Sequence, residues 1–317
     1  DFSEVRGQQP AKRALEIAAA GGHNLLMVGP PGAGKSMLAK CLPSILPPMT
    51  REETLEASEL HSVAGLLTGG TLLTSRPFRA PHHTISNVGL AGGGTRARPG
   101  ELSLAHCGVL FLDELPEFSR SALEVLRQPL EDGVITISRA AGSVTYPSRC
   151  MMVAALNPCP CGQFGVEGGR CSCSQADIAR YLRRISGPLL DRIDLQVEGA
   201  PLNFAEVSAP PAEPSRVIRE RVCAARERQN SRFHGTGIAS NSAMGRRQVT
   251  EYCALSSQAQ DFLSEAFSAM NLSARSYDRL CKVARTIADL AGADAIAPEH
   301  LAEAVQYRAL DRKYWKR

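Results

Sequence analysis

A glycine-rich segment between an apolar run and a helical pattern constrains the fold of this chain more than any other feature. The apolar run Leu25–Val28 has the length and continuity of a strand buried on both faces of a parallel sheet. It leads directly into Gly-Pro-Pro-Gly-Ala-Gly-Lys-Ser at residues 29–36, which matches the phosphate-binding pattern G-x-x-x-x-G-K-[ST]. Residues 37–42 then continue as a helical pattern. This order of strand, glycine loop and helix predicts a P-loop that binds ATP.

Each residue type in this loop has a physical reason to be there. Glycines allow the backbone N–H groups to turn toward the phosphates, and the following helix presents its positive end to them. Lys35 is expected to reach the β- and γ-phosphates, and Ser36 to ligate Mg²⁺. The residues that we expect to hold the nucleotide here are Gly29, Pro30, Pro31, Gly32, Ala33, Gly34, Lys35, Ser36 and Met37.

Two further apolar runs end in polar residues. The run at 108–112 ends at Asp113 and Glu114, which we interpret as a ligand of the Mg²⁺ shell and as the general base that activates water. The run at 150–156 ends at Asn157. Strands that alternate with helical stretches predict a doubly wound α/β domain, whose ligands bind at the carboxyl ends of the strands.

The chain is predicted to divide into a core at 1–200, a linker rich in proline and alanine at 201–214, and a small all-helical lid at 215–317. The helices expected in the lid span 215–232, 257–270, 274–291 and 298–310. Two insertions interrupt the core, one at about 71–101 and the other a β-hairpin at 134–146.

Composition points to a cytoplasmic protein. No apolar run approaches the ~20 residues that cross a membrane, and the N-terminus lacks the character of an export signal. In a chain of 317 residues without such a signal, the ten cysteines are read as thiols or metal ligands. The missing initiator methionine indicates a fragment of a longer protein.

Charge is distributed unevenly, although the net charge is only +4. Residues 60–100 contain no Asp or Glu but hold several arginines and the adjacent His82 and His83. Ordinary solvated faces mix both signs, so these arginines either contact an anionic partner or pair with acids elsewhere in the chain. Adjacent histidines on a strand face opposite ways and are not expected to share one metal, so we interpret them as loop packing or phosphate contacts.

Four cysteines form a second candidate site in the loop at 159–173. The pairs Cys159-x-Cys161 and Cys171-x-Cys173 are separated by nine residues that include four glycines. Four thiolates can close a tetrahedral structural Zn²⁺ site, although Cys-x₂-Cys is the commoner spacing. The alternatives are free thiols or a redox pair.

With these features in place, the chain resembles the magnesium-chelatase-like AAA+ proteins of the ComM/YifB type over nearly its whole length. The resemblance rests on several separate motifs, which are Gly7-Gln8, Gly21 to Asn24, Arg76 to His83, Asn157 to Gly162, Gly187 to Asp194 and Ala284 to Leu290. It implies a ring, expected to be a hexamer, with ATP bound between neighbouring subunits. It also implies a Lon-protease-like domain before Asp1.

The resemblance also assigns roles to single residues. It places Val5 and Gln8 near the adenine and makes Asn157 the sensor that orients the lytic water. Arg192 becomes the finger that acts on the neighbour's ATP, and Arg275 the sensor of the lid. From the residues alone, a surface ion-pair role is the favoured interpretation of either arginine. The two insertions correspond to the helix-2 insert and the pre-sensor hairpin of this clade.

The resemblance implies two alternative functions. ComM-type members translocate on DNA and drive branch migration, and on that reading Arg96, Arg98 and Arg139 grip phosphates in the ring pore. The alternative is a chelatase-type ATPase that remodels a protein partner for metal insertion. A chaperone that unfolds proteins would carry an aromatic-hydrophobic-glycine pore loop, which this sequence lacks in the expected place. The acid-free insertion favours DNA.

Overall fold

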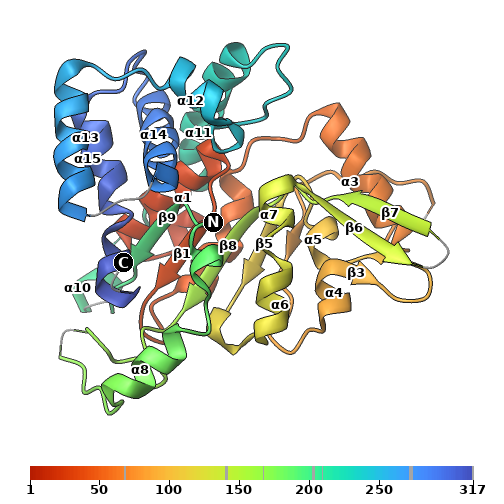
Figure 1. The fold of residues 1–317 in the computed structure, drawn as a ribbon, viewed down its shortest axis with the longest axis horizontal. Helices are drawn as coiled ribbons and strands as arrows, with labels where there is room; N and C mark the ends of the chain where they lie inside the picture. Colours follow the sequence, from red (N-terminus) through yellow and green to blue (C-terminus); the bar gives the residue numbers. More distant parts are fainter. Residues whose placement is uncertain are drawn as a thin grey trace. The chain divides into compact units, whose positions relative to one another are not determined.

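A computed structural model describes residues 1–67, 69–139, 142–166, 168–201, 204–208, 210–270 and 274–315, with the backbone alone at residues 139, 207, 269, 270 and 274. The chain forms two compact units (Figure 1). The first comprises Asp1–Pro47, Cys161–Ser172 and Ile193–Arg317, and the second comprises Pro48–Pro160 and Cys173–Arg192.

The first unit contains the predicted strand, glycine loop and helix. Strand β1 (Leu25–Val28) is fully buried and pairs in parallel with β9 (Leu195–Glu198). Helix α1 (Gln9–Gly21) precedes β1 and buries its alanine-rich face, and α2 (Lys35–Cys41) follows the glycine loop. Helix α1 ends where Gly22 adopts a left-handed backbone with φ of 71°, a conformation that glycine adopts without strain.

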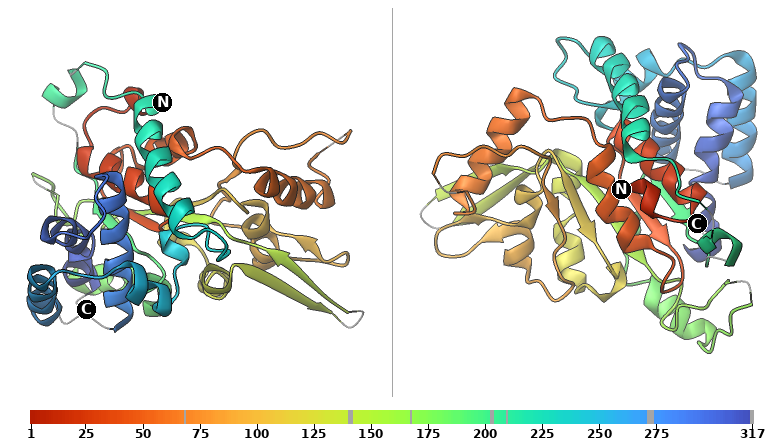
Figure 2. Two further views of the ribbon diagram at one scale, coloured as in Figure 1. Left: turned by 90° about the horizontal axis from the view of Figure 1, so that it is seen from above. Right: turned by 180° about the vertical axis from the view of Figure 1, so that it is seen from behind.

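The same unit contains the helices of the C-terminal part of the chain (Figures 1 and 2). They are α11 (Ser215–Arg232), η4 (Asn241–Ala243), α12 (Arg246–Tyr252), α13 (Ser257–Met270), α14 (Ala274–Leu290), α15 (Pro298–Gln306) and the π-helical turn η5 (Asp311–Trp315). The prediction that the last long helix reaches residue 310 is wrong. Helix α15 ends at Gln306, and the backbone carbonyl of the next residue, Tyr307, accepts the N–H of Gln196 in β9 at 2.9 Å.

The second unit is built on three parallel strands. Their order is β2 (Phe78–Arg79), β5 (Val109–Leu112) and β8 (Met151–Leu156), and the last two are buried along their whole length. The helices of this unit are α3 (Arg51–Val63), α4 (Asn87–Ala91), α5 (Glu101–Leu104), α6 (Arg120–Val125), α7 (Pro129–Asp132), α8 (Gln175–Leu182) and α9 (Gly187–Leu190). Parallel strands with helices in both units confirm the predicted α/β class.

The two insertions of the core lie side by side in the second unit (Figures 1 and 2). The first contains the short antiparallel pair β3 (Gly92–Gly93) and β4 (Arg98–Pro99). The second is the predicted hairpin, β6 (Val134–Arg139) with β7 (Gly142–Pro147), whose turn lies outside the described residues. The hydroxyl of Tyr146 in β7 donates to the backbone carbonyl of Ala97 at 2.9 Å, which joins the two insertions.

The predicted linker at 201–214 contains a short helix, α10 (Phe204–Ser208). The division into a core at 1–200, a linker and a lid at 215–317 stays a prediction, because the two compact units follow contacts between residues and interleave along the chain. No helix in the described part of the chain is long and apolar enough to cross a membrane.

Candidate nucleotide site and cysteine cluster

The glycine loop adopts a conformation that needs glycine at two positions. Gly32 and Gly34 have φ values of 80° and 79°, where a side chain strains the backbone. No atom of the described chain lies within 4 Å of the place where a Cβ would stand on either glycine. The loop therefore opens outward at these residues, as the close approach of a phosphate group requires.

Lys35, the first residue of α2, holds the loop together from the inside. Its side chain is only 9% exposed, and its Nζ donates to the carbonyl oxygens of Gly29 and Pro30 at 2.7 and 2.9 Å. A Cβ on Gly29 would lie 2.6 Å from the carbonyl oxygen of Gly199. The start of the loop is thus packed against the chain that leaves β9.

The segment before α1 lies against the same loop. Val5 and Gln8 are both buried, and Gln8 has a left-handed backbone with φ of 55°. Its Nε2 donates to the carbonyl of Ala200 at 2.6 Å. A Cβ on Gly199 would lie 3.5 Å from Oε1 of Gln8 and 3.6 Å from Cβ of Ala33. The role of Val5 and Gln8 at the adenine stays a prediction.

The second unit brings the predicted acids and Asn157 to one edge of its sheet. Asp113 and Glu114 follow β5, and Asn157 follows β8, its parallel neighbour. Glu114 has a left-handed backbone with φ of 52°, and its N–H donates to Oδ1 of Asp113 at 3.0 Å. Its carboxylate is 55% exposed. Strained backbone of this kind concentrates at functional sites.

His83 contacts the predicted general base. Its Nδ1 lies 3.3 Å from Oε2 of Glu114, and its ring packs on His82 and edge-to-face on Phe118. The ring contacts agree with the interpretation as loop packing, but no sequence pattern predicted the contact with Glu114. Strand register brings the two segments that carry these residues to the same edge of the sheet. Phe78 pairs with Val109 in parallel, and His83 and Glu114 each lie five residues further along.

The two candidate arginines differ in their surroundings. Arg192 is 14% exposed and lies in the second unit, where it pairs with Glu131 and donates to the carbonyls of Pro188 at 2.8 Å and Arg127 at 3.3 Å. Arg275 is exposed in the first turn of α14, in the first unit. The predicted P-loop and the predicted catalytic acids also belong to different units, so each half of the expected site is defined only within its own unit.

The arginines of the acid-free segment fall into two groups. Arg76 pairs with Glu53 at 2.7 Å, and Arg79 forms a two-pronged pair with Glu101 that raises the pKa of its guanidinium. Arg96 and Arg98 are exposed on the β3–β4 turn and form no hydrogen bond or ion pair within the described residues. Pairing with acids therefore explains the first group and not the second. The side chain of Arg139 lies outside the described part.

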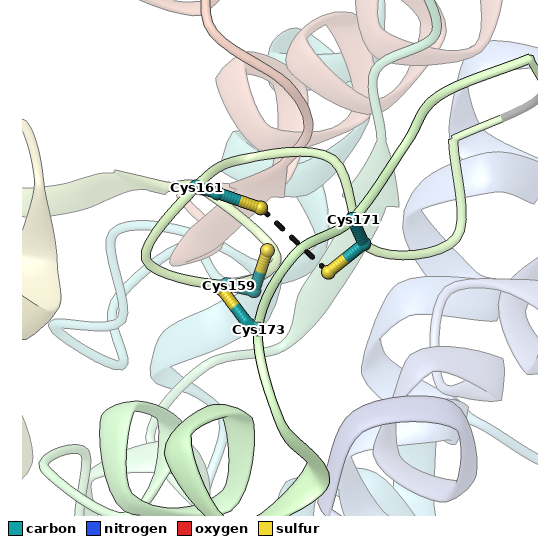
Figure 3. Close-up of side chains that lie close together, drawn as sticks. All are labelled: Cys159, Cys161, Cys171 and Cys173. Carbon is teal, nitrogen blue, oxygen red and sulfur yellow. Dashed lines mark hydrogen bonds between the residues drawn. The ribbon is translucent and has the colours of Figure 1, made fainter.

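The four predicted cysteine ligands come together (Figure 3). All four sulfur atoms lie within 4.8 Å of one another, and Sγ of Cys161 lies 3.6 Å from Sγ of Cys171. Cys159 is buried, whereas Cys161, Cys171 and Cys173 are partly exposed.

Glu56, His106 and Cys107 form another group with metal-ligating atoms close together. Nε2 of His106 lies 2.8 Å from Glu56, and its Nδ1 accepts the backbone N–H of Arg149, so both ring nitrogens are engaged. Burial raises the pKa of the Cys107 thiol to about 12, which keeps it protonated. Hydrogen bonds within the second unit thus account for the position of the buried His106 in this group.

Comparison with known families decides the family. The family described as "Magnesium chelatase, subunit ChlI" matches residues 1–207, and its C-terminal counterpart matches residues 212–308. The chain belongs to this magnesium-chelatase family. The resemblance drawn from its motifs is thereby confirmed, as is the order of an AAA+-like α/β domain followed by a helical C-terminal domain.

The chain is also similar to individual relatives. The chain is 46% identical to the uncharacterized protein YifB of Salmonella typhimurium and 47% identical to the competence protein ComM of Haemophilus influenzae, each over 98% of its length. It is 29% identical to the magnesium-chelatase 67 kDa subunit of Chlorobaculum parvum over 50% of its length. It spans 61% of the YifB protein, 60% of ComM and 23% of the chelatase subunit.

Proposed function

We propose that this chain is the ATPase part of a ring-forming motor that translocates on DNA. The observation that carries the proposal is a complete phosphate-binding loop, in which Gly32 and Gly34 have a left-handed backbone and open space beside them. The same chain places Asp113 and Glu114 directly after the buried strand β5. ATP with Mg²⁺ supplies the transferable phosphoryl group. These residues fit the nucleotide because backbone N–H groups, an ammonium, a hydroxyl and carboxylates are the groups that phosphates and Mg²⁺ prefer.

The chemistry follows from the residue types. The ammonium of Lys35 neutralises charge on the phosphates, while Ser36 and Asp113 hold Mg²⁺ or its water shell. The carboxylate of Glu114 accepts a proton from the attacking water, which Asn157 orients. Arg192 and Arg275 stabilise the charge that develops on the phosphates, Arg192 by reaching the nucleotide of a neighbouring subunit. A ring of six subunits in the cytoplasm is part of this proposal.

The DNA part of the proposal rests on Arg96 and Arg98. Both are exposed and unpaired within the described residues, and their turn is tied to the second insertion by the bond from Tyr146 to Ala97. Arginines so placed hold phosphates without reading bases. The competence protein ComM, 47% identical to this chain, favours work on transforming DNA, with branch migration as the expected activity.

The test is the ATPase rate measured with and without single-stranded and forked DNA. Replacing Arg96, Arg98 and Arg139 with alanine should weaken binding to all sequences alike and lower the slope of binding against salt by roughly one unit per lost contact. A matched loss of the exposed Arg219, Arg246 and Arg247 in the first unit controls for net charge. A wild-type ring that binds no DNA, or whose ATPase ignores DNA, would overturn the motor.

A second function is favoured by the family itself. Its description is that of a magnesium-chelatase subunit, and the Chlorobaculum relatives carry that name. On this alternative the chain remodels a protein partner during metal insertion. Its ATPase would then ignore DNA, and the substitution of the insertion arginines would change nothing in a DNA-binding assay.

A structural Zn²⁺ at the cysteine cluster completes the set of cofactors that we propose. Zn–S bonds of ~2.3 Å in a tetrahedron separate the sulfur atoms by ~3.8 Å. The 3.6 Å between Cys161 and Cys171, and the 4.8 Å limit for all four sulfurs, support this arrangement. Four thiolates leave no open coordination position, so the ion would stabilise the loop and take no part in chemistry.

A further inference from the structure

The loop between the two cysteine pairs touches the phosphate-binding loop. Gly162 directly follows Cys161 and has a left-handed backbone with φ of 78°. A Cβ at this position would stand 2.4 Å from Cδ and 2.9 Å from Cγ of Pro31. Glycine at 162 therefore serves both a turn and a close approach to the ring of Pro31.

The same loop is supported on another side by the C-terminal segment. The ring of Phe164 packs edge-to-face on Tyr314, with 6.3 Å between centroids. A Cβ on Gly165 would lie 3.6 Å from the side chain of Lys313. The loop that contains Gly162, Phe164 and Gly165 thus contacts both Pro31 and η5, which belong to the same unit.

Pro31 is a sensitive point of the nucleotide site. Its ring fixes its own φ, so displacement of the ring is passed to the neighbouring backbone rather than absorbed by rotation. The carbonyls immediately before it, at Gly29 and Pro30, are the groups that hold Nζ of Lys35. A shift of Gly162 therefore changes the place from which Lys35 reaches a phosphate.

We propose that zinc bound by the four cysteines braces the phosphate-binding loop, so that occupancy of the metal site sets the affinity for ATP. Ligation of Cys161 fixes the residue next to Gly162, and Gly162 fixes Pro31. The inference rests on the proposed nucleotide site. By linkage, ATP tightens zinc binding by the same factor as zinc tightens ATP binding.

The experiment measures zinc content and ATP affinity on the same preparations. Purified protein should hold about one zinc per chain. Removal of zinc with a zinc-selective chelator, followed by assay in excess Mg²⁺, should raise the Kd of a fluorescent ATP analogue about 10-fold. Added Zn²⁺ should restore the original Kd. Circular dichroism before and after removal shows that the protein remains folded.

Two variants test the zinc site and the contact between Gly162 and Pro31 independently. Replacing Cys171 and Cys173 with serine should lose zinc and weaken ATP binding, whereas Cys223→Ser, a cysteine outside the cluster, should do neither. Gly162→Ala should keep its zinc and still weaken ATP binding, because the added methyl group meets Pro31.

Three results would overturn the inference. The first is a folded wild-type protein without zinc, or with a disulfide between Cys161 and Cys171 detected by mass spectrometry. The second is loss of zinc with the Kd unchanged within twofold, which leaves the proposed function intact. The third is a zinc-loaded wild-type protein that binds no ATP, which overturns the proposed function as well.

Discussion

Glu114 is the residue on which hydrolysis depends in the proposed mechanism, and its neighbours restrict it in two ways. Its backbone is held in a left-handed conformation, with the N–H bonded to Asp113. Its carboxylate lies 3.3 Å from the ring of His83. A carboxylate that is more than half exposed has several rotamers available, so a contact of this kind restricts the direction in which it points.

At this scale we predict that His83→Ala lowers kcat for ATP hydrolysis about 5- to 50-fold and leaves KM for ATP within twofold. The reason is that His83 orients the base, and the orientation of a general base affects the chemical step rather than the binding of ATP. His82→Ala is the matched control, because His82 stacks on His83 and contacts Thr84 rather than Glu114. Steady-state kinetics on both variants and on His83→Gln, which retains a donor, make the check.

The prediction would be contradicted if His82→Ala and His83→Ala had equal effects, because both would then act only through the packing of their loop. Partial recovery of kcat in His83→Gln would separate orientation of the base from a loss of stability, since a merely structural role does not depend on a donor at this position.

At the scale of elements, the motifs Gly21 to Asn24 and Ala284 to Leu290 contribute to a buried polar network in the first unit. Neither motif contains a residue that we predict to be catalytic. His23 is fully buried, with Nε2 2.8 Å from Oγ1 of Thr286 and Nδ1 3.3 Å from Asp194. Asp289 accepts bonds from Arg232 and from Asn241. These contacts join the chain before β1 to the middle of α14. A structural role therefore explains the polar residues of both motifs.

Asp194 makes this network depend on pH. Burial by itself raises the pKa of its carboxyl group, but His23, Arg279 and Lys282 outweigh burial and leave the pKa below its ordinary value. A lowered folded-state pKa contributes stability above the pKa of the unfolded chain, about 3.9, and this stability is lost as the pH falls through the folded value.

We therefore predict that Asp194→Asn lowers the free energy of unfolding at pH 7 by about 1–3 kcal/mol. The difference from wild type should narrow as the pH falls below about 4, the unfolded-state pKa, and through the lower pKa of the folded state. Asp294→Asn, at a fully exposed position, should cost almost nothing. Urea unfolding at a series of pH values checks this, and a difference that stayed constant down to low pH would contradict it.

Elements that depend on consecutive residues were predictable from the sequence, and those that depend on distant partners were not. The P-loop with its strand and helix, the hairpin at 134–146 and α11 follow from local patterns. Strand β2 has only two residues, and β9 contains the buried polar residue Gln196, whose Nε2 donates to Asp311 at 2.6 Å, so neither strand has the expected pattern. The contacts of His83 with Glu114 and of Gly162 with Pro31 depend on strand register and loop packing, which no local motif encodes.

At the scale of the whole molecule, the residues of the proposed hydrolytic site come from separate parts of the chain. The P-loop belongs to the first unit, while Glu114, Asn157 and Arg192 belong to the second. Arg192 is occupied within its own unit by Glu131 and two carbonyls. If Arg192 serves a neighbouring subunit, it must exchange these partners for a phosphate. The more negative charge of a triphosphate makes that exchange favourable.

The proposed ring is tested most directly by mixing defective subunits. Arg192→Ala alone should lower ATP hydrolysis by 10³-fold or more, as expected when a finger that stabilises transferring phosphate is removed. Glu114→Gln alone should bind ATP and hydrolyse almost none. Mixed rings contain some interfaces at which an intact Glu114 faces an intact Arg192, because each variant damages a different half of a shared site. Hydrolysis should therefore recover partly, with a maximum near equal proportions of the two.

Arg184→Ala is the control, because it removes an arginine that pairs with Glu117 in the same unit. This variant should still hydrolyse ATP. When it is mixed with Glu114→Gln, it should behave as wild-type subunits do. Activity that stays at the background level at every mixing ratio, in rings shown to exchange subunits, would mean that Arg192 does not act between subunits.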